Sequence, residues 1–309
     1  MKVVVSGGTG FIGKRVVERL LRDGHYVGVL SRKPGLERRT GVASFTWDPL
    51  AEEPPVESVN GMDAVLHLAG EPVNQRWNNE VKRRIRDSRV LGTRHLVDTI
   101  ARAAHRPKML VCTSAIGYYG ERGDEILNEQ SAAGEGFLAD VCQAWEAEAM
   151  RAESFGLRVV RLRIGFVLGS EGGAMAQMLP VFRMGLGGRL GSGKQWMPWI
   201  HVADVAGLFA FAVESPVSRI WNAVSPNPVT NAEFTRVLAE AVHRPAIFPV
   251  PPFALKLMFG ELGRHMLDSA RVVPDGPLKA GYTFAYPGLA EALAGLVGKR
   301  TQPNPGVRL

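Results

Sequence analysis

Short apolar runs alternate with longer amphipathic segments along the first part of the chain. Residues 2–6 (KVVVS) form a run rich in β-branched side chains, and a glycine-rich turn follows it. Residues 11–22 then place apolar side chains at the three- and four-residue spacing of a helix that ends near Gly24. Further apolar runs at 26–32, 44–48 and 63–70 predict three more strands.

The same alternation continues into the middle of the chain. A long helical pattern covers about 76–104, an apolar run at 108–115 predicts a fifth strand, and helical spacing returns at 137–149. Residues 157–169 (LRVVRLRIGFVLG) predict a sixth strand. Strands that alternate with helices form a parallel sheet with helices on both faces. The sequence therefore predicts an α/β fold with a Rossmann-type doubly wound parallel sheet.

The pattern changes after residue 170. Residues 187–201 are rich in Gly, Trp and Pro, which is typical of a binding loop. A connector at 222–230 precedes a helix expected at 231–242, and Pro251 and Pro252 mark the entry to another. These segments predict a smaller C-terminal substrate lobe. We expect a Rossmann domain at 1–170, to which about 199–225 return, a smaller lobe from 171–198 and 226–300, and a loose tail at 301–309.

Composition narrows the class of protein. The chain has 309 residues, of which 46% are hydrophobic and 22% charged, as in a soluble globular protein with a full core. The formal net charge is +7, but the basic residues are scattered among acids, and the densest run, 82–89, lies within a helical pattern. No long basic stripe with interleaved aromatic residues is present, which argues against RNA binding and against any nucleic-acid partner.

The few cysteines and the short apolar runs bear on metal binding and on cellular location. Cys112 and Cys142 are the two cysteines, with neither a CxxC motif nor histidines at metal-ligand spacing, so we expect no disulfide and no metal site. No signal peptide precedes the first strand, and the apolar runs are too short and interrupted to span a bilayer. These observations favour a cytoplasmic protein without a membrane partner.

A glycine motif predicts a nucleotide cofactor. Gly7, Gly10 and Gly13 stand between the first strand and the first helix, at the spacing that lets backbone approach a pyrophosphate. The helix N-terminus then supplies N–H donors and partial positive charge. We expect the whole turn to contact the cofactor, including Thr9, Phe11 and Ile12.

The end of the second strand indicates which cofactor binds. NAD-preferring sites usually carry Asp or Glu there, to bind the ribose 2′-hydroxyl. This chain has Ser31 and Arg32 instead, which suit a 2′-phosphate and favour NADP(H) over NAD(H), although a basic surface turn would look the same. Asp48 ends the third strand and is placed to meet the adenine. Leu68, Ala69 and Gly70 end the fourth strand and are placed to line the adenosine side.

Several motifs resemble a known superfamily. GGTGFIG, HLAG, RVLGT, TSAIGYYG and WIHVADVA resemble the extended short-chain dehydrogenase/reductases, the nucleotide-sugar epimerase and dehydratase-like Rossmann proteins. LAGEPVNQRWN, GFLADVCQAWEAEA and the tail ARVVPDGPLKAGYTFAYPGLAEAL are similar to one atypical branch of NAD(P)-dependent epimerase-like oxidoreductases with a small C-terminal domain of unknown function.

The resemblance implies a further cofactor contact at Arg89. This residue occupies the place of the Asn in the usual N-V-x-G-T segment, and the alternative is an exposed Arg on a basic helix. The other positions that the resemblance assigns to NADP(H) are Gly7, Gly10, Phe11, Ile12, Gly13, Ser31, Arg32, Leu68 and Ala69.

The chain departs from the family where the chemistry is expected. Counted back from Tyr119, the usual Ser/Thr position falls on Ala115, and the positions of the Tyr-x-x-x-Lys pair fall near Leu138 and Cys142. The proton donor and the Lys that lowers its pKa are therefore both missing. The remaining candidates for catalysis are Ser114, Tyr118, Tyr119 and Cys142, whereas Asp140 and Glu146 are more typical of helix surface or packing.

A second group of residues is expected beside the substrate. It consists of Glu71, after the fourth strand, and four residues of the Gly/Trp-rich segment. His201 has an alternative role as a helix cap, because a helix start with Asp204 follows it. The substrate-side candidates are Glu71, Lys194, Trp196, Trp199 and His201.

Two functional hypotheses follow. The first is an NADP(H)-binding oxidoreductase or epimerase that acts on an unidentified small molecule of sugar-nucleotide or carbonyl type, without the standard Tyr-x-x-x-Lys pair. The alternative is a catalytically silent NADP(H)-sensing or scaffold protein. The missing pair favours the sensor, and the Gly/Trp-rich substrate lobe favours the enzyme. We expect a monomer or a homodimer, because helices 76–104 and 137–153 occupy the places that pair in dimers of many relatives.

Overall fold

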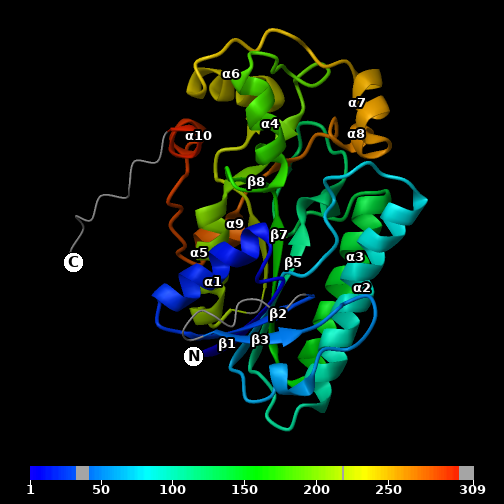
Figure 1. Ribbon diagram of the computed structural model, residues 1–309, viewed down its shortest axis with the longest axis vertical. Helices are drawn as coiled ribbons and strands as arrows, with labels where there is room; N and C mark the ends of the chain where they lie inside the picture. Colours follow the sequence, from blue (N-terminus) through cyan, green and yellow to red (C-terminus); the bar gives the residue numbers. More distant parts are fainter. Residues whose placement is uncertain (33–41, 218, 299–309) are drawn as a thin grey trace, which may run out of the picture.

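A seven-stranded parallel sheet forms the centre of the computed structural model, which describes residues 1–32, 42–217 and 219–298 (Figure 1). The strand order is β11-β7-β5-β4-β1-β2-β3, so the chain starts in the middle, runs to one edge, and then returns to build the other half. This reversal leaves a crevice at the carboxyl ends of β1 and β4, where such sheets bind ligands. The strands are β1 (Lys2–Ser6), β2 (Tyr26–Ser31), β3 (Val42–Thr46), β4 (Ala64–His67), β5 (Met109–Ala115), β7 (Arg158–Ile164) and β11 (Ile220–Ala223).

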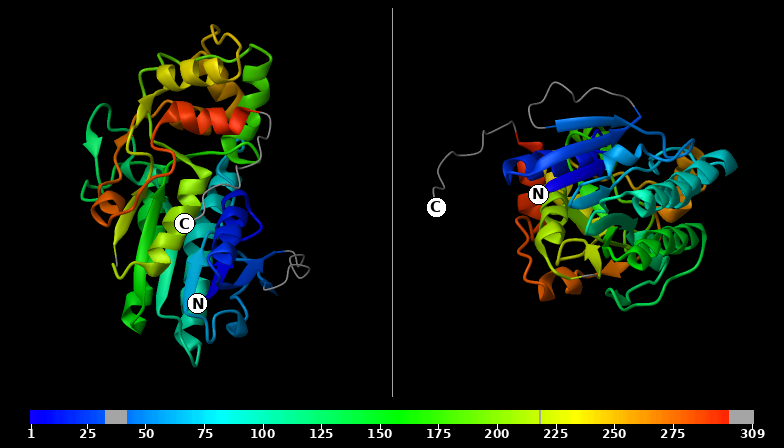
Figure 2. Two further views of the ribbon diagram at one scale, coloured as in Figure 1. Left: turned by 90° about the vertical axis from the view of Figure 1, so that its left-hand side faces the viewer. Right: turned by 90° about the horizontal axis from the view of Figure 1, so that it is seen from below.

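Helices cover both faces of the sheet, which confirms the predicted fold class (Figures 1 and 2). Helices α1 (Phe11–Arg22) and α5 (Val202–Glu214) pack on one face, and α2 (Asn79–Arg102) and α3 (Phe137–Met150) pack on the other. Alternate residues of β1 divide between the two cores: Val3 and Val5 join the first, and Val4 the second. The run of β-branched residues is apolar throughout because the strand is buried on both faces.

Further helices gather beyond the carboxyl ends of the strands, in the upper part of Figure 1. They are α4 (Gly173–Arg183), α6 (Asn231–Ala241), α7 (Pro252–Phe259), α8 (Leu262–His265) and α10 (Leu289–Val297). Helices α4, α6 and α10 share a core of their own, which includes Leu179, Trp199, Phe234 and Leu293.

Short elements tie this region to the sheet. Three two-stranded ladders pair β6 (Ile126–Leu127) with β13 (Arg271–Val272), β8 (Phe166–Leu168) with β10 (Trp199–His201), and β9 (Trp196–Met197) with β12 (Val229–Thr230). Helix α9 (Asp275–Lys279) packs on β11. The 3₁₀ turns are η1 (Val56–Ser58), η2 (Ile116–Tyr119) and η3 (Arg151–Phe155).

The predicted sixth strand is two strands, which corrects the expectation of one run over 157–169. β7 ends at Ile164, and β8 leaves the main sheet to pair with β10. Gly165 is the hinge: its N–H donates to Ala223, whereas the next N–H, of Phe166, donates to Pro198. A Cβ on Gly165 would lie 2.3 Å from the Pro198 oxygen, so only glycine permits this approach.

Other boundaries differ by up to three residues. The third strand starts at Val42 and ends at Thr46, earlier than predicted, and Thr230 caps α6 by accepting from the Glu233 N–H. Across 1–32, 42–217 and 219–298, no helix is long and apolar enough to cross a membrane. The predicted tail at 301–309 lies outside the described residues.

Candidate functional site

The glycine turn after β1 is built around close backbone contacts. Gly7 has φ +71°, and a Cβ there would lie 2.9 Å from the Ala69 nitrogen. A Cβ on Gly13 would lie 2.1 Å from the Gly7 oxygen, inside any permitted contact. The turn therefore packs directly against the end of β4 and the first turn of α1. Gly10 caps α1 without a side chain, so the N-terminus of the helix is open to a ligand.

A cavity of about 220 Å³ lies at the carboxyl ends of β1, β2 and β4. It collects nine of the thirteen predicted cofactor residues, together with Glu71, which we had placed beside the substrate. In the turn after β3 the sequence predicted Asp48 alone, and it did not predict the other lining residues Leu30, Trp47, Pro49, Leu50, Pro72 and Ser88. The lining residues are Gly7, Thr9, Gly10, Leu30, Ser31, Arg32, Trp47, Asp48, Pro49, Leu50, Leu68, Ala69, Gly70, Glu71, Pro72 and Ser88.

The charges of this cavity match the sequence expectation at β2. Ser31 ends β2 and is buried, and the exposed Arg32 follows it in the cavity wall. Asp48 stands in the facing turn, where its Oδ1 accepts a 3.0 Å hydrogen bond from the Leu50 N–H. The end of β2 thus presents a hydroxyl and a guanidinium to the cavity, and no carboxylate.

Phe11, Ile12 and Gly13 lie behind the cavity and do not line it. The Phe11 ring packs on glycines of the loop that enters α4, where a Cβ on Gly169 would lie 2.4 Å from the ring. Ile12 packs against the core between α1 and the sheet. Their side chains anchor α1, and any cofactor contact would come from their backbone N–H groups.

Arg89 also stands behind the cavity wall. Its Nη1 donates to the Glu71 oxygen at 3.0 Å and to the Ile85 oxygen at 3.1 Å. The guanidinium lies 5.2 Å from the centre of the Trp145 ring, and its carbon would be 3.4 Å from a Cβ on Gly70. Burial lowers its pKa, while nearby Cys142 and Glu71 act in the opposite direction. Arg89 therefore holds the loop after β4, and it is not an exposed surface Arg.

The three conventional catalytic positions hold packed, non-catalytic groups. Leu138 lies against Gly117, where a Cβ would meet it at 3.1 Å. The Cys142 Sγ lies 3.6 Å from the Ala115 oxygen. Burial raises the pKa of Cys142 to about 11, so its thiol stays protonated near neutral pH. Cys142 is therefore unsuited to act as a nucleophile.

Two of the predicted catalytic hydroxyls belong to a buried ion-pair network. Ser114 Oγ donates to Glu146 Oε1 at 2.7 Å, and Arg163 binds the same carboxylate through Nε at 2.8 Å and Nη2 at 2.9 Å. Tyr119 OH accepts from Arg163 Nη1 at 3.0 Å and lies 2.7 Å from Asn222 Oδ1. Tyr119 is fully buried, and burial raises its pKa. Ser114 and Tyr119 thus hold the end of β5, and neither faces a cavity.

Tyr118 is the remaining hydroxyl candidate. Its ring is half-buried and lies 3.3 Å from the Arg163 guanidinium, with the Tyr119 ring edge-on at 5.3 Å. This stacking holds the Tyr118 side chain against the network. It lines neither the cavity nor the cleft described next.

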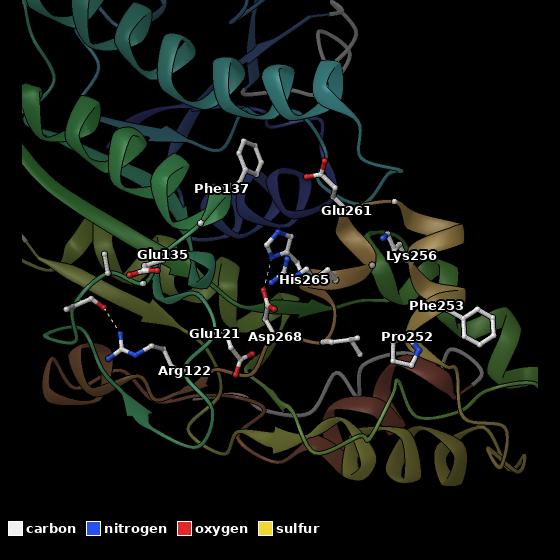
Figure 3. Close-up of a pocket in the computed structure, with 18 residues that line it drawn as sticks. Glu121, Arg122, Glu135, Phe137, Pro252, Phe253, Lys256, Glu261, His265 and Asp268 are labelled. Atoms are coloured by element: carbon white, nitrogen blue, oxygen red, sulfur yellow. Dashed lines mark hydrogen bonds and ion pairs between the residues drawn. The ribbon is translucent and has the colours of Figure 1, made fainter.

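A larger cleft of about 1320 Å³ opens beside the first turn of α3 (Figure 3). One wall is the segment from η2 to α3, and the other is formed by α7 and α8. Sequence reasoning placed no residue in this cleft. Its lining residues are Glu121, Arg122, Ala132, Ala133, Gly134, Glu135, Gly136, Phe137, Pro252, Phe253, Lys256, Gly260, Glu261, Gly263, Arg264, His265, Leu267 and Asp268.

A histidine–carboxylate pair stands in the wall of this cleft (Figure 3). His265 Nδ1 lies 2.7 Å from Asp268 Oδ2, and the imidazole lies 5.4 Å from the Trp77 ring. Trp77 in turn packs edge-on against Phe137, the first residue of α3. The imidazole therefore stands near the helical turn in which Leu138 replaces the usual Tyr. The sequence analysis identified neither residue, because His265 ends the short helix α8 and Asp268 follows it in a loop.

The loop after β4 connects the cavity and the cleft. Glu71 lies in the wall of the smaller cavity, and six residues later Trp77 contacts His265. The Trp77 N–H donates to the Phe259 oxygen, which fixes this loop to the end of α7.

The remaining substrate-side candidates line neither the cavity nor the cleft. Trp199 is fully buried and donates to the Asn227 oxygen at 3.0 Å. His201 caps α5 through the Ala203 N–H and stacks on Tyr286, and burial lowers its pKa to about 4. Trp and His in a Gly-rich segment looked like ligand contacts, but they fill the core of the C-terminal region.

Trp196 and Lys194 also lie away from the cleft wall. Trp196 Nε1 donates to Asp124 Oδ1 at 2.7 Å, and the Arg271 guanidinium lies 4.3 Å from its ring. Lys194 is exposed in the preceding turn. In the described part of the chain, no group of three or more His, Cys, Asp or Glu is arranged to hold a metal.

Comparison with known proteins yields one family and a consistent set of relatives. Residues 3–223 match the model of the NAD dependent epimerase/dehydratase family, and residues 250–296 match a domain of unknown function, DUF1731. The chain is 40% identical over 302 residues to an Arabidopsis thaliana protein, "Epimerase family protein SDR39U1 homolog, chloroplastic", covering 96% of this chain and 87% of that one. It is 34% identical over 303 residues to the Bacillus subtilis epimerase family protein YfhF, covering 97% and 99%.

Solved structures show the same likeness. The human epimerase family protein SDR39U1, crystallised with NADPH, matches with a TM-score of 0.88 at 37% identity, covering 96% of this chain and 99% of that one. A nucleoside-diphosphate sugar epimerase from Corynebacterium glutamicum matches with a TM-score of 0.79 at 33% identity, covering 96% of this chain and 58% of that one.

Proposed function

The chain belongs to the NAD dependent epimerase/dehydratase family, and on this premise we propose that it is an NADP(H)-dependent oxidoreductase or epimerase. Its substrate would be a small molecule of sugar-nucleotide or carbonyl type. The observation that carries the proposal is the cavity at the ends of β1, β2 and β4, whose wall has Arg32 where NAD-preferring sites carry an acid. The NADPH in the human relative supports the same cofactor.

Different residues of the cavity would bind different parts of the cofactor. The turn from Gly7 to Gly13 would hold the pyrophosphate on the N-terminus of α1, where backbone N–H groups are available. Ser31 and Arg32 would bind the 2′-phosphate, and Asp48 would face the adenine. When bound, the nicotinamide supplies or accepts the hydride. Arg89 acts indirectly, because it fixes the loop after β4 through the Glu71 oxygen.

Proton transfer needs a group other than the usual Tyr. His265 is the candidate in the cleft wall, because imidazole can both donate and accept a proton near neutral pH. Asp268 would orient the ring by accepting from Nδ1–H, which leaves Nε2 for the substrate. The ring of Trp77 contacts His265, and Trp77 belongs to the loop that lines the cofactor cavity at Gly70, Glu71 and Pro72.

One set of observations favours the alternative, a catalytically silent NADP(H) sensor. Ala115, Leu138 and Cys142 occupy the conventional positions, and the hydroxyls of Ser114 and Tyr119 are committed to internal hydrogen bonds. In a sensor, cofactor binding would stabilise one conformation that a partner recognises.

For either function we propose a cytoplasmic protein that is a monomer or a homodimer formed through α2 and α3.

Binding and turnover together separate the two functions. The purified chain is titrated with NADPH and NADH, and NADPH oxidation is then followed with a panel of carbonyl compounds and sugar nucleotides. Tight NADPH binding with turnover of one panel member supports the enzyme. Tight binding without turnover supports the sensor. Failure to bind either cofactor contradicts both.

A further inference from the structure

The side chains in the cleft wall are either charged or apolar. Among its eighteen lining residues there is no Ser, Thr, Asn, Gln, Tyr or Trp. Hydroxyl and amide side chains usually give a polar ligand its orientation, because they match neutral hydroxyls and carbonyls one by one. A sugar or a nucleobase would meet only charged side chains, the His265 imidazole and backbone groups as hydrogen-bond partners in this wall. The apolar part of the wall matches an apolar chain better than it matches a sugar.

Three of the four carboxylates in the wall already have partners. The Glu121 carboxylate accepts from the backbone N–H groups of Gly123 and Ser269. Glu261 pairs with Lys82 at 2.7 Å, and Asp268 with His265. Hydrogen bonds thus hold three of the four carboxylates in place, and Lys82 also neutralises the charge of Glu261.

The cations differ. Arg122 is held by Glu125 through two contacts of 2.8 and 2.7 Å. Lys256 and Arg264 are both exposed, and neither side chain forms an ion pair with any residue in the described part of the chain. They stand on the neighbouring helices α7 and α8, on the same wall of the cleft. Two cations without an ion-pair partner on one wall can bind an anionic group of the ligand.

The same wall carries exposed apolar surface. Phe253 lines the cleft and is 74% exposed, and Leu257, one helical turn further along α7, is 71% exposed. Lys256 is three residues from Phe253 and thus lies on the same side of the helix (Figure 3). Large apolar side chains this exposed are typical of a binding surface. Phe137 and Leu267 add apolar groups to the lining.

We propose that this cleft binds an amphipathic anion, with the anionic group at Lys256 and Arg264 and an apolar body along Pro252, Phe253 and Leu267. This inference rests on the proposed function and narrows its substrate class to carbonyl compounds with an apolar chain and an acidic group, in preference to sugar nucleotides. The cleft of about 1320 Å³ exceeds the usual volume of small-molecule pockets, roughly 300–1,000 Å³, and so has room for an extended chain.

Three probes separate the two parts of the ligand. Decyl phosphate carries both parts, glucose 1-phosphate has the same head on a sugar body, and 1-decanol has the chain without the charge. Each is titrated calorimetrically into the full-length protein, with and without NADPH and below the micellar concentration. We expect decyl phosphate to bind about tenfold or more tightly than either other probe. Glucose 1-phosphate binding as tightly as decyl phosphate would overturn the proposal.

Substitutions locate the binding. Phe253→Ser should lower the affinity for decyl phosphate about tenfold, because it removes an apolar contact with the chain. Lys256→Gln should lower this affinity about fivefold, because it removes an ionic contact with the phosphate. Tyr26→Ser and Arg22→Gln are matched controls, an exposed aromatic and an exposed cation outside the cleft, and should change nothing. Equal affinity in all four variants overturns the proposal.

Cofactor titrations on the same samples separate this inference from the function beneath it. Intact NADPH binding without a preference for decyl phosphate overturns the inference alone. Absence of NADPH binding in the unmodified chain overturns the proposed function, whatever the cleft binds.

Discussion

The Ser114 hydroxyl donates a 2.7 Å hydrogen bond to the Glu146 carboxylate, and both side chains are buried, at 3% and 5% exposure. Ser114 is one residue before the position at which relatives place their catalytic Ser or Thr. Here it serves a structural network instead, because Glu146 also neutralises the buried guanidinium of Arg163. The end of β5 is thus part of a buried structural network, and in our proposal the proton is transferred in the cleft.

Removing the carboxylate of this network should be costly. Glu146→Ala leaves the Arg163 guanidinium buried without its partner, and we expect a loss of about 3–5 kcal/mol in the free energy of unfolding. Urea denaturation measures it. Glu240→Ala is the control, because the Glu240–Arg236 pair is more than half exposed and its loss should cost about 1 kcal/mol or less. Equal losses in the two variants would contradict the structural role of Glu146.

Two buried histidines should make stability depend on pH. Burial lowers the pKa of His67 to about 3 and that of His201 to about 4, both from an ordinary 6.5. Each imidazole binds protons more tightly in the unfolded chain, so the stability they contribute is full above pH 6.5 and declines as the pH falls. Between pH 6.5 and 5 the free energy of unfolding should fall, approaching about 1.4 kcal/mol per pH unit for each histidine.

The variant His67→Asn isolates one of these contributions. In urea unfolding at several pH values, the free energy of unfolding should depend less steeply on pH than in the unmodified chain. The difference is the contribution of the one proton that His67 binds on unfolding. The exposed His105 is the control, and His105→Asn should leave the slope unchanged. An unchanged slope in His67→Asn would show that His67 keeps an ordinary proton affinity in the fold.

Two helical glycines should respond in opposite ways to alanine. In Gly13→Ala the new Cβ would meet the Gly7 oxygen at 2.1 Å, so the cofactor turn must shift. We expect destabilisation of about 1–3 kcal/mol and NADPH affinity at least tenfold weaker. Gly295→Ala in α10 meets nothing within 4 Å and should stabilise by roughly 0.5–1 kcal/mol. Thermal unfolding and cofactor titration report both effects, and normal NADPH affinity in Gly13→Ala would argue against this turn as the pyrophosphate site.

His265 should matter for turnover and not for cofactor binding. With a carbonyl substrate found in the panel, His265→Gln should lower kcat about 10²–10⁴-fold while the Kd for NADPH stays the same. Asp268→Asn should lower kcat less, because it removes only the orientation of the ring. His105→Gln provides the control. Full kcat in His265→Gln would remove this residue from the mechanism.

Local signals predicted the strands and the helix around the glycine turn. The glycine turn, the strands around it and the acid-free end of β2 are each encoded within a few adjacent residues, and nine of the residues proposed to bind the cofactor line one cavity. The family and the parallel sheet follow from the same segments.

Long-range packing decided what the sequence could not predict. The break at Gly165 depends on Pro198, and the burial of Trp199 depends on the core it shares with α4, α6 and α10. The cleft forms where α8 approaches α3, elements far apart in sequence, so the pair of His265 and Asp268 carried no recognisable context. Trp199 and His201 are buried and line neither the cavity nor the cleft, because Trp and His also pack inside a fold.

We propose that this chain binds NADP(H) and that the Arg32 guanidinium binds the 2′-phosphate of the cofactor. The direct measurement is a fluorescence titration of NADPH and NADH into the unmodified chain and into Arg32→Ala. We predict that the unmodified chain prefers NADPH, and that Arg32→Ala loses roughly tenfold or more in NADPH affinity with little change for NADH. Equal affinities for the two cofactors in the unmodified chain, or an unchanged preference in Arg32→Ala, would contradict the account.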